Sequence, residues 1–225
     1  MVLQILTYTH HITTMLFGIF LSAFFLGVKQ DKKNILQLLS LAVVSGILYV
    51  LCVLLFGTET VDQIYPLIVH APLLFVLVLY YKFRVLPSLI SIFTAYLCCQ
   101  CSNWMGLFAL ALTGQEWCYY VCRILVTVRA FILLCRYVCQ TTAMLFGKTD
   151  RELLIIGSLP IIYYIFDYAT TKFSSLLYSG NKAVPEFLGF AMCLTYLLFL
   201  LVYFREYEMK NKAEQYLSLI HISEP

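Results

Sequence analysis

Three arginines and one aspartate lie inside long apolar stretches of this sequence, where charged side chains are rare. The arginines Arg123, Arg129 and Arg136 share one stretch, and Asp167 lies near the end of the next. Ionisable groups at membrane depth are costly and usually mark ligand, ion or proton sites. Arg129 is near the middle of its stretch, where a guanidinium needs a carboxylate, a carbonyl or water. We therefore expect Arg129 to face the interior of a helix bundle.

The other charged groups differ in depth. Arg123 and Arg136 lie about two turns to either side of Arg129, and their long side chains can reach the two membrane interfaces. Asp167 lies about 14 residues after Leu153, or roughly 21 Å at 1.5 Å per residue, at the depth expected for Arg123. Two interpretations remain open. The pair Arg123 and Asp167 either forms a structural ion pair, or lines an outward-opening pocket and contacts opposite charges on a peptide or other zwitterionic ligand.

Histidines and amides are predicted in the same outer layer. A histidine inside a membrane protein makes an interior hydrogen bond, binds a ligand or senses pH, and amides hold neighbouring helices together or bind ligand. His10 and His11 lie near the outer end of the first helix. The candidate ligand site or intramembrane polar network comprises Arg123, Arg129, Asp167, His70, Asn103 and Gln100.

The composition determines which elements must position these residues. The chain has 225 residues, of which 62% are hydrophobic and only 12% charged, and its mean hydropathy is +0.87. Soluble domains carry about a quarter charged residues. The net charge of +3 comes from short connections. The composition therefore indicates a membrane protein and excludes a disordered chain, a secreted disulfide scaffold, a nucleic-acid binder and a free-standing soluble catalytic domain.

Seven apolar stretches are each close to the length that a helix needs to cross the hydrocarbon core, which is about 20 residues. The predicted fold class is all-α, a polytopic membrane bundle of about seven transmembrane helices. Pro66 and Pro72 predict a kink in the third helix. The predicted helices cover about residues 3–28, 35–56, 64–81, 88–112, 117–145, 153–168 and 187–204.

The connections carry unequal charge. Ten lysines and arginines fall in alternate connections, whereas the opposite connections hold only Lys172 and Lys182 beside four acidic residues. The positive-inside rule then predicts an outer N-terminus and a cytoplasmic C-terminus. Residues 169–186 form the longest outer connection, and Ser179-Gly180-Asn181 is a turn signal within it. Among the connections, we expect this one alone to have room to fold over a ligand.

Nine cysteines do not form a recognisable metal or catalytic pattern. Zinc sites usually use CxxC knuckles in turns, whereas Cys98, Cys99 and Cys101 lie within one predicted helix and point to different faces. Cysteine here behaves as a small apolar residue, and only Cys118 and Cys122 lie near the outer surface, where oxidation is conceivable. No hydrolase, phosphate-binding or metalloprotease motif occurs in the sequence. We expect no metal and no cofactor in this chain.

The last apolar stretch continues as a charged helix. Glu206 and Lys210, like Glu208 and Lys212, follow the favourable i, i+4 order. Two interpretations are open: the helix passes motion to a following domain, or it is a solvated tail.

Several stretches of the chain resemble a known family. They are YPLIVHAPLLFVLVLYYK, SLISIFTAYLCCQCSNWMGLFALALTG, EWCYYVCRILVT, IYYIFDYATT and EFLGFAMCLTYLLFLLVYFREYE. Together they are similar to the membrane sensor region of GHKL-type sensor histidine kinases of Firmicutes. The resemblance implies a homodimer, a dimerising helix after the last span, and an ATP-binding domain that would use ATP and Mg²⁺ to phosphorylate a response regulator. It also suggests a peptide signal, because peptide-pheromone sensors have a related architecture.

The C-terminal sequence SLIHISEP resembles translated sequencing-adapter read-through. We therefore expect the native chain to depart from this sequence near Tyr216, and a genuine short C-terminus is the alternative. His221 is not expected to be a phosphoacceptor, because Pro225 four residues later would break its helix. The predicted organisation is a membrane sensor domain (1–204), the start of a cytoplasmic signalling helix (205–216) and a non-native tail (217–225).

The sequence thus predicts a multi-pass protein of a bacterial cytoplasmic membrane that detects an extracellular ligand for a two-component system. Its expected partners are the lipid bilayer, a second copy of the chain and a response regulator, with no nucleic acid. Whether the chain is part of an enzyme depends on the missing kinase domain. The alternative is a small membrane transporter or substrate-binding membrane subunit, which would carry polar residues along a full path across the bilayer.

Overall fold

A computed structural model describes residues 2–173 and 183–223 of the chain, without the side chains of residues 183–186, 211 and 214–223. All regular structure within these residues is helical. The tip of the long outer connection, with its Ser179-Gly180-Asn181 turn, and the side chains of the expected non-native tail lie outside the described residues.

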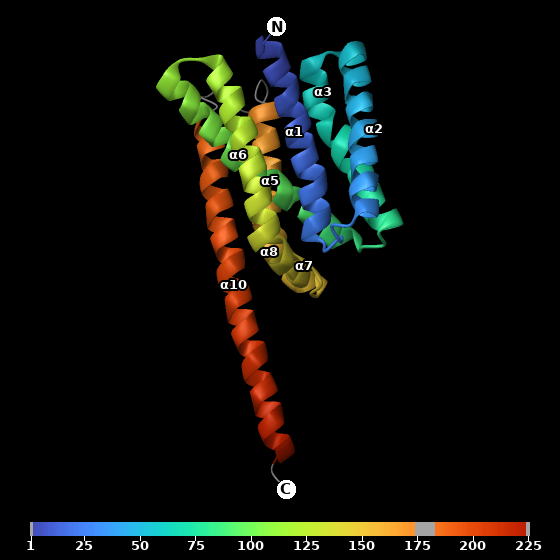
Figure 1. Ribbon diagram of the computed structural model, residues 1–225, viewed down its shortest axis with the longest axis vertical. Helices are drawn as coiled ribbons and strands as arrows, with labels where there is room; N and C mark the ends of the chain where they lie inside the picture. Colours follow the sequence, from blue (N-terminus) through green and yellow to red (C-terminus); the bar gives the residue numbers. More distant parts are fainter. Residues whose placement is uncertain (1, 174–182, 224–225) are drawn as a thin grey trace.

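The helices run up and down as an antiparallel bundle (Figure 1). Three short π-helical segments, η1, η2 and η3, continue or interrupt the α-helices. In chain order the elements are α1 (Val2–Phe25), α2 (Lys32–Phe56), α3 (Thr58–Tyr65), η1 (Pro66–His70), α4 (Ala71–Phe75), η2 (Val76–Tyr80), α5 (Val85–Thr113), α6 (Glu116–Tyr137), α7 (Cys139–Phe146), α8 (Asp150–Asp167), η3 (Tyr168–Lys172) and α10 (Ala183–Ser223).

Six of the helical passes are long and apolar enough to cross a membrane, which makes the chain a multi-pass membrane protein by length and composition. They are 32–56, 58–80, 85–113, 116–137, 150–172 and 187–210. The first helix, α1, lies alongside them in Figure 1 but is not among the six. Its first half is rich in threonine and histidine, which lowers its hydropathy.

Helix α5 forms the centre of the bundle. Within its membrane-spanning window 61% of residues are buried, against 17% for α2 and 11% for α6. Small residues, among them Ser88, Ser91, Ala95 and Ser102, account for many of its buried positions. Because small side chains let helix backbones approach closely, α5 packs against α1, α6, α8 and α10.

The third pass contains π-helical turns near the prolines that predicted a kink. Pro66 begins η1, and the N–H of Ala71 bonds to the Pro66 carbonyl five residues back. Proline lacks an N–H and its ring crowds the preceding turn, which disfavours the regular α-helical pattern. The irregularity that the structure shows in this pass is the pair of π-helical segments η1 and η2.

Three predicted boundaries were wrong. The third predicted helix does not begin at residue 64, because α3 begins at Thr58. The fifth predicted helix does not run without a break to residue 145, because α6 ends at Tyr137 and α7 restarts at Cys139 after Val138, whose φ is −115°. The sixth predicted helix does not end at residue 168, because η3 extends it to Lys172. Residues 169–172 are therefore helical and not part of an open loop.

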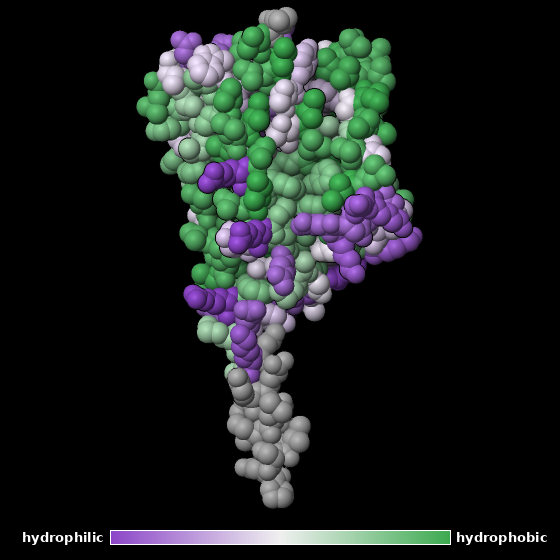
Figure 2. Space-filling view, viewed as in Figure 1, coloured by the Kyte–Doolittle hydropathy of each residue, from purple (hydrophilic) through white to green (hydrophobic). Residues whose placement is uncertain are grey.

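The two ends of the bundle differ in charge. The connections at the end where α10 leaves the bundle carry Lys29, Lys82, Arg84 and Lys148, and hydrophilic side chains gather at this end in Figure 2. We call it the basic end and the opposite end, where α1 begins, the upper end. At the upper end Gly114 closes the α5–α6 turn with a φ of 66°, a left-handed conformation that favours glycine.

Candidate functional site

Asp167 is buried among tyrosines near the upper end of α8. Its side chain is only 4% exposed. One carboxylate oxygen accepts a hydrogen bond from the Tyr96 hydroxyl of α5, and the other accepts one from Tyr163, at 3.3 Å. No lysine or arginine of the described residues forms an ion pair with it. Two neutral donors from two helices therefore satisfy a carboxylate at membrane depth.

His70 is linked to this carboxylate through Tyr96 and lies in a ring of aromatic side chains. Its Nδ1 is 2.9 Å from the Tyr164 hydroxyl, and its ring centroid is 5.2 Å from that of Tyr65 and 6.0 Å from that of Tyr96. His70 therefore has an interior hydrogen bond, which was one of its predicted roles. The Asp167 cluster, as we name it, consists of Tyr65, His70, Tyr96, Tyr163, Tyr164, Asp167 and Tyr168.

Two π-helical segments supply members of the Asp167 cluster. His70 is the last residue of η1, and Tyr168, the first residue of η3, directly follows Asp167. The Thr171 hydroxyl donates to the Asp167 carbonyl at 2.7 Å, which satisfies a main-chain group in this irregular turn. π-Helical turns are rare and occur frequently at functional sites. Their convergence here singles out this cluster from the rest of the bundle.

An ion pair lies just above the cluster. Lys172 Nζ is 3.1 Å from an Asp62 carboxylate oxygen, and the Gln63 side-chain amide donates to the Lys172 carbonyl at 3.3 Å. These contacts join α3 to η3. The lysine nearest in sequence to Asp167 is thus engaged by another acid, and Asp167 keeps its tyrosine partners.

The Asp167 cluster also touches α10. Gly189 of α10 packs against the Tyr163 ring so closely that an added methyl group would overlap the phenol. Tyr163 in turn donates to Asp167. A single side chain therefore contacts both the buried carboxylate and the helix that leaves the bundle.

Arg123 does not pair with Asp167, which rules out the predicted structural ion pair in this structure. It donates to the Tyr119 hydroxyl of its own helix and packs over Gly106 of α5. Gly106 is ten residues after Tyr96, or about 15 Å along α5, so the arginine and the aspartate contact different levels of that helix. An ion pair between them would require α6 to lie beside α8, but α5 packs against both.

Asn103 belongs to the neighbourhood of Arg123. Its side-chain oxygen lies 3.5 Å from the Tyr119 hydroxyl, which links α5 to α6. His10 of α1 joins the same region, since its ring centroid is 6.1 Å from that of Tyr120. Gln100 is buried in α5. The predicted single polar network is therefore divided: Arg123 and Asn103 form one group, and His70 and Asp167 form another.

Arg129 is exposed on the outer surface of the bundle, so the prediction that it faces the interior was wrong. Arg136, seven residues later on the same face, is also exposed, and its guanidinium carbon lies 5.5 Å from the Tyr137 ring centroid. Arg129 was expected in the interior because a guanidinium could find hydrogen-bond partners there. Helix α6 packs its buried face against α1 and α5, and this leaves Arg129 on the outer surface.

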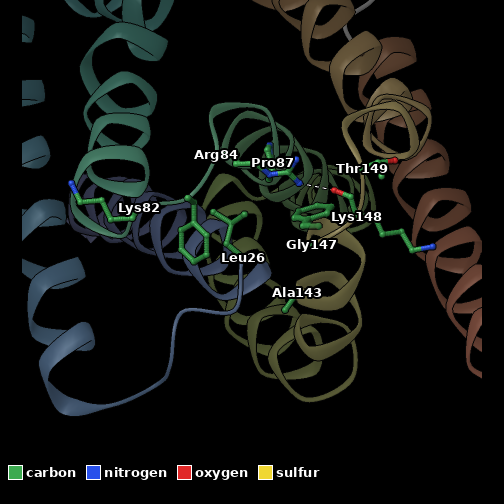
Figure 3. Close-up of a pocket in the computed structure, with 10 residues that line it drawn as sticks. Leu26, Lys82, Arg84, Pro87, Ala143, Gly147, Lys148 and Thr149 are labelled. Atoms are coloured by element: carbon green, nitrogen blue, oxygen red, sulfur yellow. Dashed lines mark hydrogen bonds between the residues drawn. The ribbon is translucent and has the colours of Figure 1, made fainter.

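A cavity of about 440 Å³ opens at the basic end among residues of α5, α7 and the adjoining turns. Its basic side chains do not converge, as Figure 3 shows: Lys82 and Lys148 point away from it in opposite directions. Arg84 donates to the Lys148 carbonyl at 2.6 Å and to Asp150 at the same distance. The turn between α7 and α8 is thus anchored to the start of α5.

Lys148 reaches from this turn to α10. Its ammonium lies 3.1 Å from the Tyr203 hydroxyl and 4.0 Å from the centroid of the Tyr207 ring. Burial lowers the pKa of Lys148, but the Tyr203 hydrogen bond and the Glu152 carboxylate outweigh burial and raise it, so the ammonium stays charged at neutral pH. Cation–π contacts and charged hydrogen bonds hold α10 at this level.

The cysteines are free thiols in the structure. Cys101 and Cys193 bring their sulfurs within 3.5 Å and join α5 to α10. Among the described residues no group of three or more histidine, cysteine or acidic side chains is arranged to hold a metal ion.

The sequence did not single out the tyrosines as partners of the aspartate. Tyrosine is common at membrane interfaces, so none of the 17 tyrosines stands out by residue type alone. A local signal was present, because Tyr163 lies four residues before Asp167, the spacing at which helical side chains meet. The hydrogen bond from Tyr96 to Asp167 depends on how α5 and α8 pack against each other, and no spacing in the sequence indicates it.

No family model matches the chain, and neither the curated proteins nor the solved structures searched contain a match.

Proposed function

We propose that this chain is a membrane signal-transducing region in which the Asp167 cluster senses a ligand or condition at the upper end and α10 carries the response to the basic end. The observation that carries the proposal is the position of Tyr163, between the Asp167 carboxylate and Gly189 of α10. A change at the carboxylate moves the phenol, and the phenol is in direct contact with the exit helix.

The geometry of α10 suits this role. Its contact face follows a spacing of four and three residues through Gly189, Cys193, Tyr196, Leu200 and Tyr203. Such a 3.5-residue repeat keeps one face of a helix against its partner over a long distance. Helix α10 then continues beyond the bundle (Figure 1), with Arg205, Glu206 and Glu208 exposed. A displacement at Gly189 can be transmitted along this continuous helix.

The cluster is closed by its own ring contacts, with centroids 4.8 Å apart for Tyr96 and Tyr164 and 4.9 Å apart for Tyr164 and Tyr168. A ligand that binds Asp167 must therefore favour an opened packing of these rings. Binding that selects one of two packings shifts the population of both the cluster and α10. A cationic or hydroxyl-bearing group suits the carboxylate, and a peptide with a free amine is one such ligand.

We further propose the orientation that charge asymmetry predicts, with the basic end in the cytoplasm and α1 as a seventh span. In this orientation the Asp167 cluster lies toward the outside of a bacterial cytoplasmic membrane. The charged part of α10 then lies in the cytoplasm, where the resemblance to GHKL-type kinases places a dimerising helix, an ATP-binding domain and a response regulator.

Sequencing of the genomic locus across the codon for Gln215, followed by an assay of the encoded protein in membranes, tests this proposal. We expect the frame to continue into a histidine-bearing helix and an ATP-binding domain, and the protein to autophosphorylate with ATP. Asp167→Asn should change the rate of autophosphorylation. A frame that ends near residue 225 in intact DNA would contradict the kinase proposal and favour a small transporter or membrane subunit.

A further inference from the structure

The surface of α6 that faces away from the bundle carries charge in an apolar setting. Its exposed residues recur at helical spacing, and we call them the α6 outer face: Leu125, Val128, Arg129, Ile132, Leu133 and Arg136. Four of the six are aliphatic, and Figure 2 shows isolated hydrophilic patches over α6 within a hydrophobic face. No hydrogen bond or ion pair from Arg129 to another described residue is present.

The two arginines on this face lie at different depths. Arg136 lies beside Cys135, which lines a groove together with Lys29 and Gln30 of the α1–α2 connection, so it is level with the basic end. Arg129 is seven residues, or about 10 Å, farther into the span. Arg136 can therefore reach water or lipid headgroups, whereas Arg129 lies well within the apolar part of α6.

The direction of α6 makes it unfavourable for the Arg129 side chain to extend toward the membrane interface at the basic end. Side chains in an α-helix leave the backbone tilted toward the helix N-terminus. The N-terminus of α6 is at the upper end, about 20 Å away, while the nearer end of the helix lies at its C-terminus. An unpaired guanidinium in this position is costly in lipid, which implies a partner beyond the described residues of the single chain.

Among its described side chains, a second copy of the chain offers no suitable acid. All of the described acidic side chains but one lie near the ends of the helices, in connections or on the charged part of α10. The remaining one, Asp167, is buried and bonded to Tyr96 and Tyr163. Homodimer formation through α6 would also bring like charges together.

We propose that the α6 outer face binds a transmembrane helix of a different protein that carries an aspartate or glutamate at mid-depth, with Arg129 as its ionic anchor. The aliphatic residues on either side provide the packing surface, and a guanidinium can bind a carboxylate with two parallel hydrogen bonds. This interaction does not depend on the proposed sensing function, because it uses the opposite side of α6 from Arg123.

The test uses the full-length chain and a defined probe helix. The chain is co-expressed with a polyleucine transmembrane helix of about 20 residues that carries one central aspartate. Association is measured by energy transfer between fused fluorescent proteins. The matched probe replaces the aspartate with leucine. We expect the aspartate helix to associate about tenfold more strongly than the leucine helix.

Variants of the chain locate the contact. Arg129→Leu should abolish the preference for the aspartate helix, Arg129→Lys should keep most of it, and Arg136→Leu should keep nearly all of it. Arg129→Asp should transfer the preference to a probe with a central lysine. This charge reversal keeps the test decisive if one variant fails to fold.

Three results would overturn the proposal. The first is equal association of the aspartate and leucine probes with the wild-type chain. The second is a preference for the aspartate probe that survives Arg129→Leu. The third is the loss of bound phosphatidylglycerol from the purified Arg129→Leu variant without any change in probe binding, which would assign Arg129 to an anionic lipid headgroup.

Discussion

Asp167 and Arg129 are both charged residues within membrane-spanning helices, but the fold treats them in opposite ways. Asp167 is buried, and two tyrosines from α5 and α8 satisfy its oxygens. Arg129 is exposed on α6 with apolar neighbours. A charge that the protein satisfies internally can act as part of a switch between packings. A charge left on the surface points to something outside the chain.

The largest difference should appear when each charge is removed. Asp167→Leu leaves the Tyr96 and Tyr163 hydroxyls without their acceptor, and we expect it to destabilise the fold by about 3 kcal/mol. Thermal unfolding in detergent, followed by helical circular dichroism, measures this loss. Asp167→Asn retains one oxygen acceptor and should lose clearly less. Equal stability of wild type and Asp167→Leu would show that the tyrosine contacts contribute nothing.

The contact between the cluster and α10 should be next in size. Gly189→Ala places a methyl group against the Tyr163 ring and should cost about 1–3 kcal/mol, because a packed interior resists added volume. Gly18→Ala is the matched control, since a methyl group there meets nothing within 4 Å. If both variants unfold at the temperature of the wild type, Tyr163 and α10 are not in close contact.

At the basic end, Lys148→Met should weaken the hold on α10. The loss of the Tyr203 hydrogen bond and of the ring contacts should cost about 1 kcal/mol. Faster trypsin cleavage at Arg205 and Lys210 in nanodiscs would reveal the looser helix. Lys33→Met, on an exposed surface, controls for the lost charge. Unchanged cleavage in the Lys148 variant would argue against this attachment.

The smallest effect should be at Arg129. In detergent, without a partner, Arg129→Leu should change stability by less than about 0.5 kcal/mol, because the side chain makes no contact that the fold requires. Arg123→Leu, which loses the hydrogen bond to Tyr119, should be clearly less stable. A marked loss of stability in the Arg129 variant would mean that the guanidinium has a partner within the chain.

The sequence predicted the helices better than it predicted the contacts between them. Apolar length and turn residues are local signals, so the start of α2 after Asp31 and the end of α5 at Gly114 could be anticipated within a few residues. The break at Val138 was missed because the apolar composition continues through it.

The site depended on information that a single sequence lacks. The number of residues from the helix ends predicted that Arg123 and Asp167 lie at the same depth. In the structure they contact α5 at positions about 15 Å apart along its axis. The exposure of Arg129 was missed because a charge at mid-depth was expected to find its partner within the same chain. The i, i+4 spacing of Tyr163 and Asp167 in the sequence indicates their contact. No sequence spacing indicates the contact between Tyr96 and Asp167, because these residues belong to different helices.

The central claim is that the state of the Asp167 cluster sets the position of α10 at the basic end. The direct measurement is the distance between spin labels at Arg151 and Glu206, which are both exposed, in the full-length chain in nanodiscs. The labels are attached to keto amino acids, which leaves the native thiols unlabelled. We predict that Asp167→Asn and Gly189→Ala both shift this distance distribution, while Gly18→Ala leaves it unchanged. Identical distributions in all four proteins would contradict the coupling of the cluster to α10.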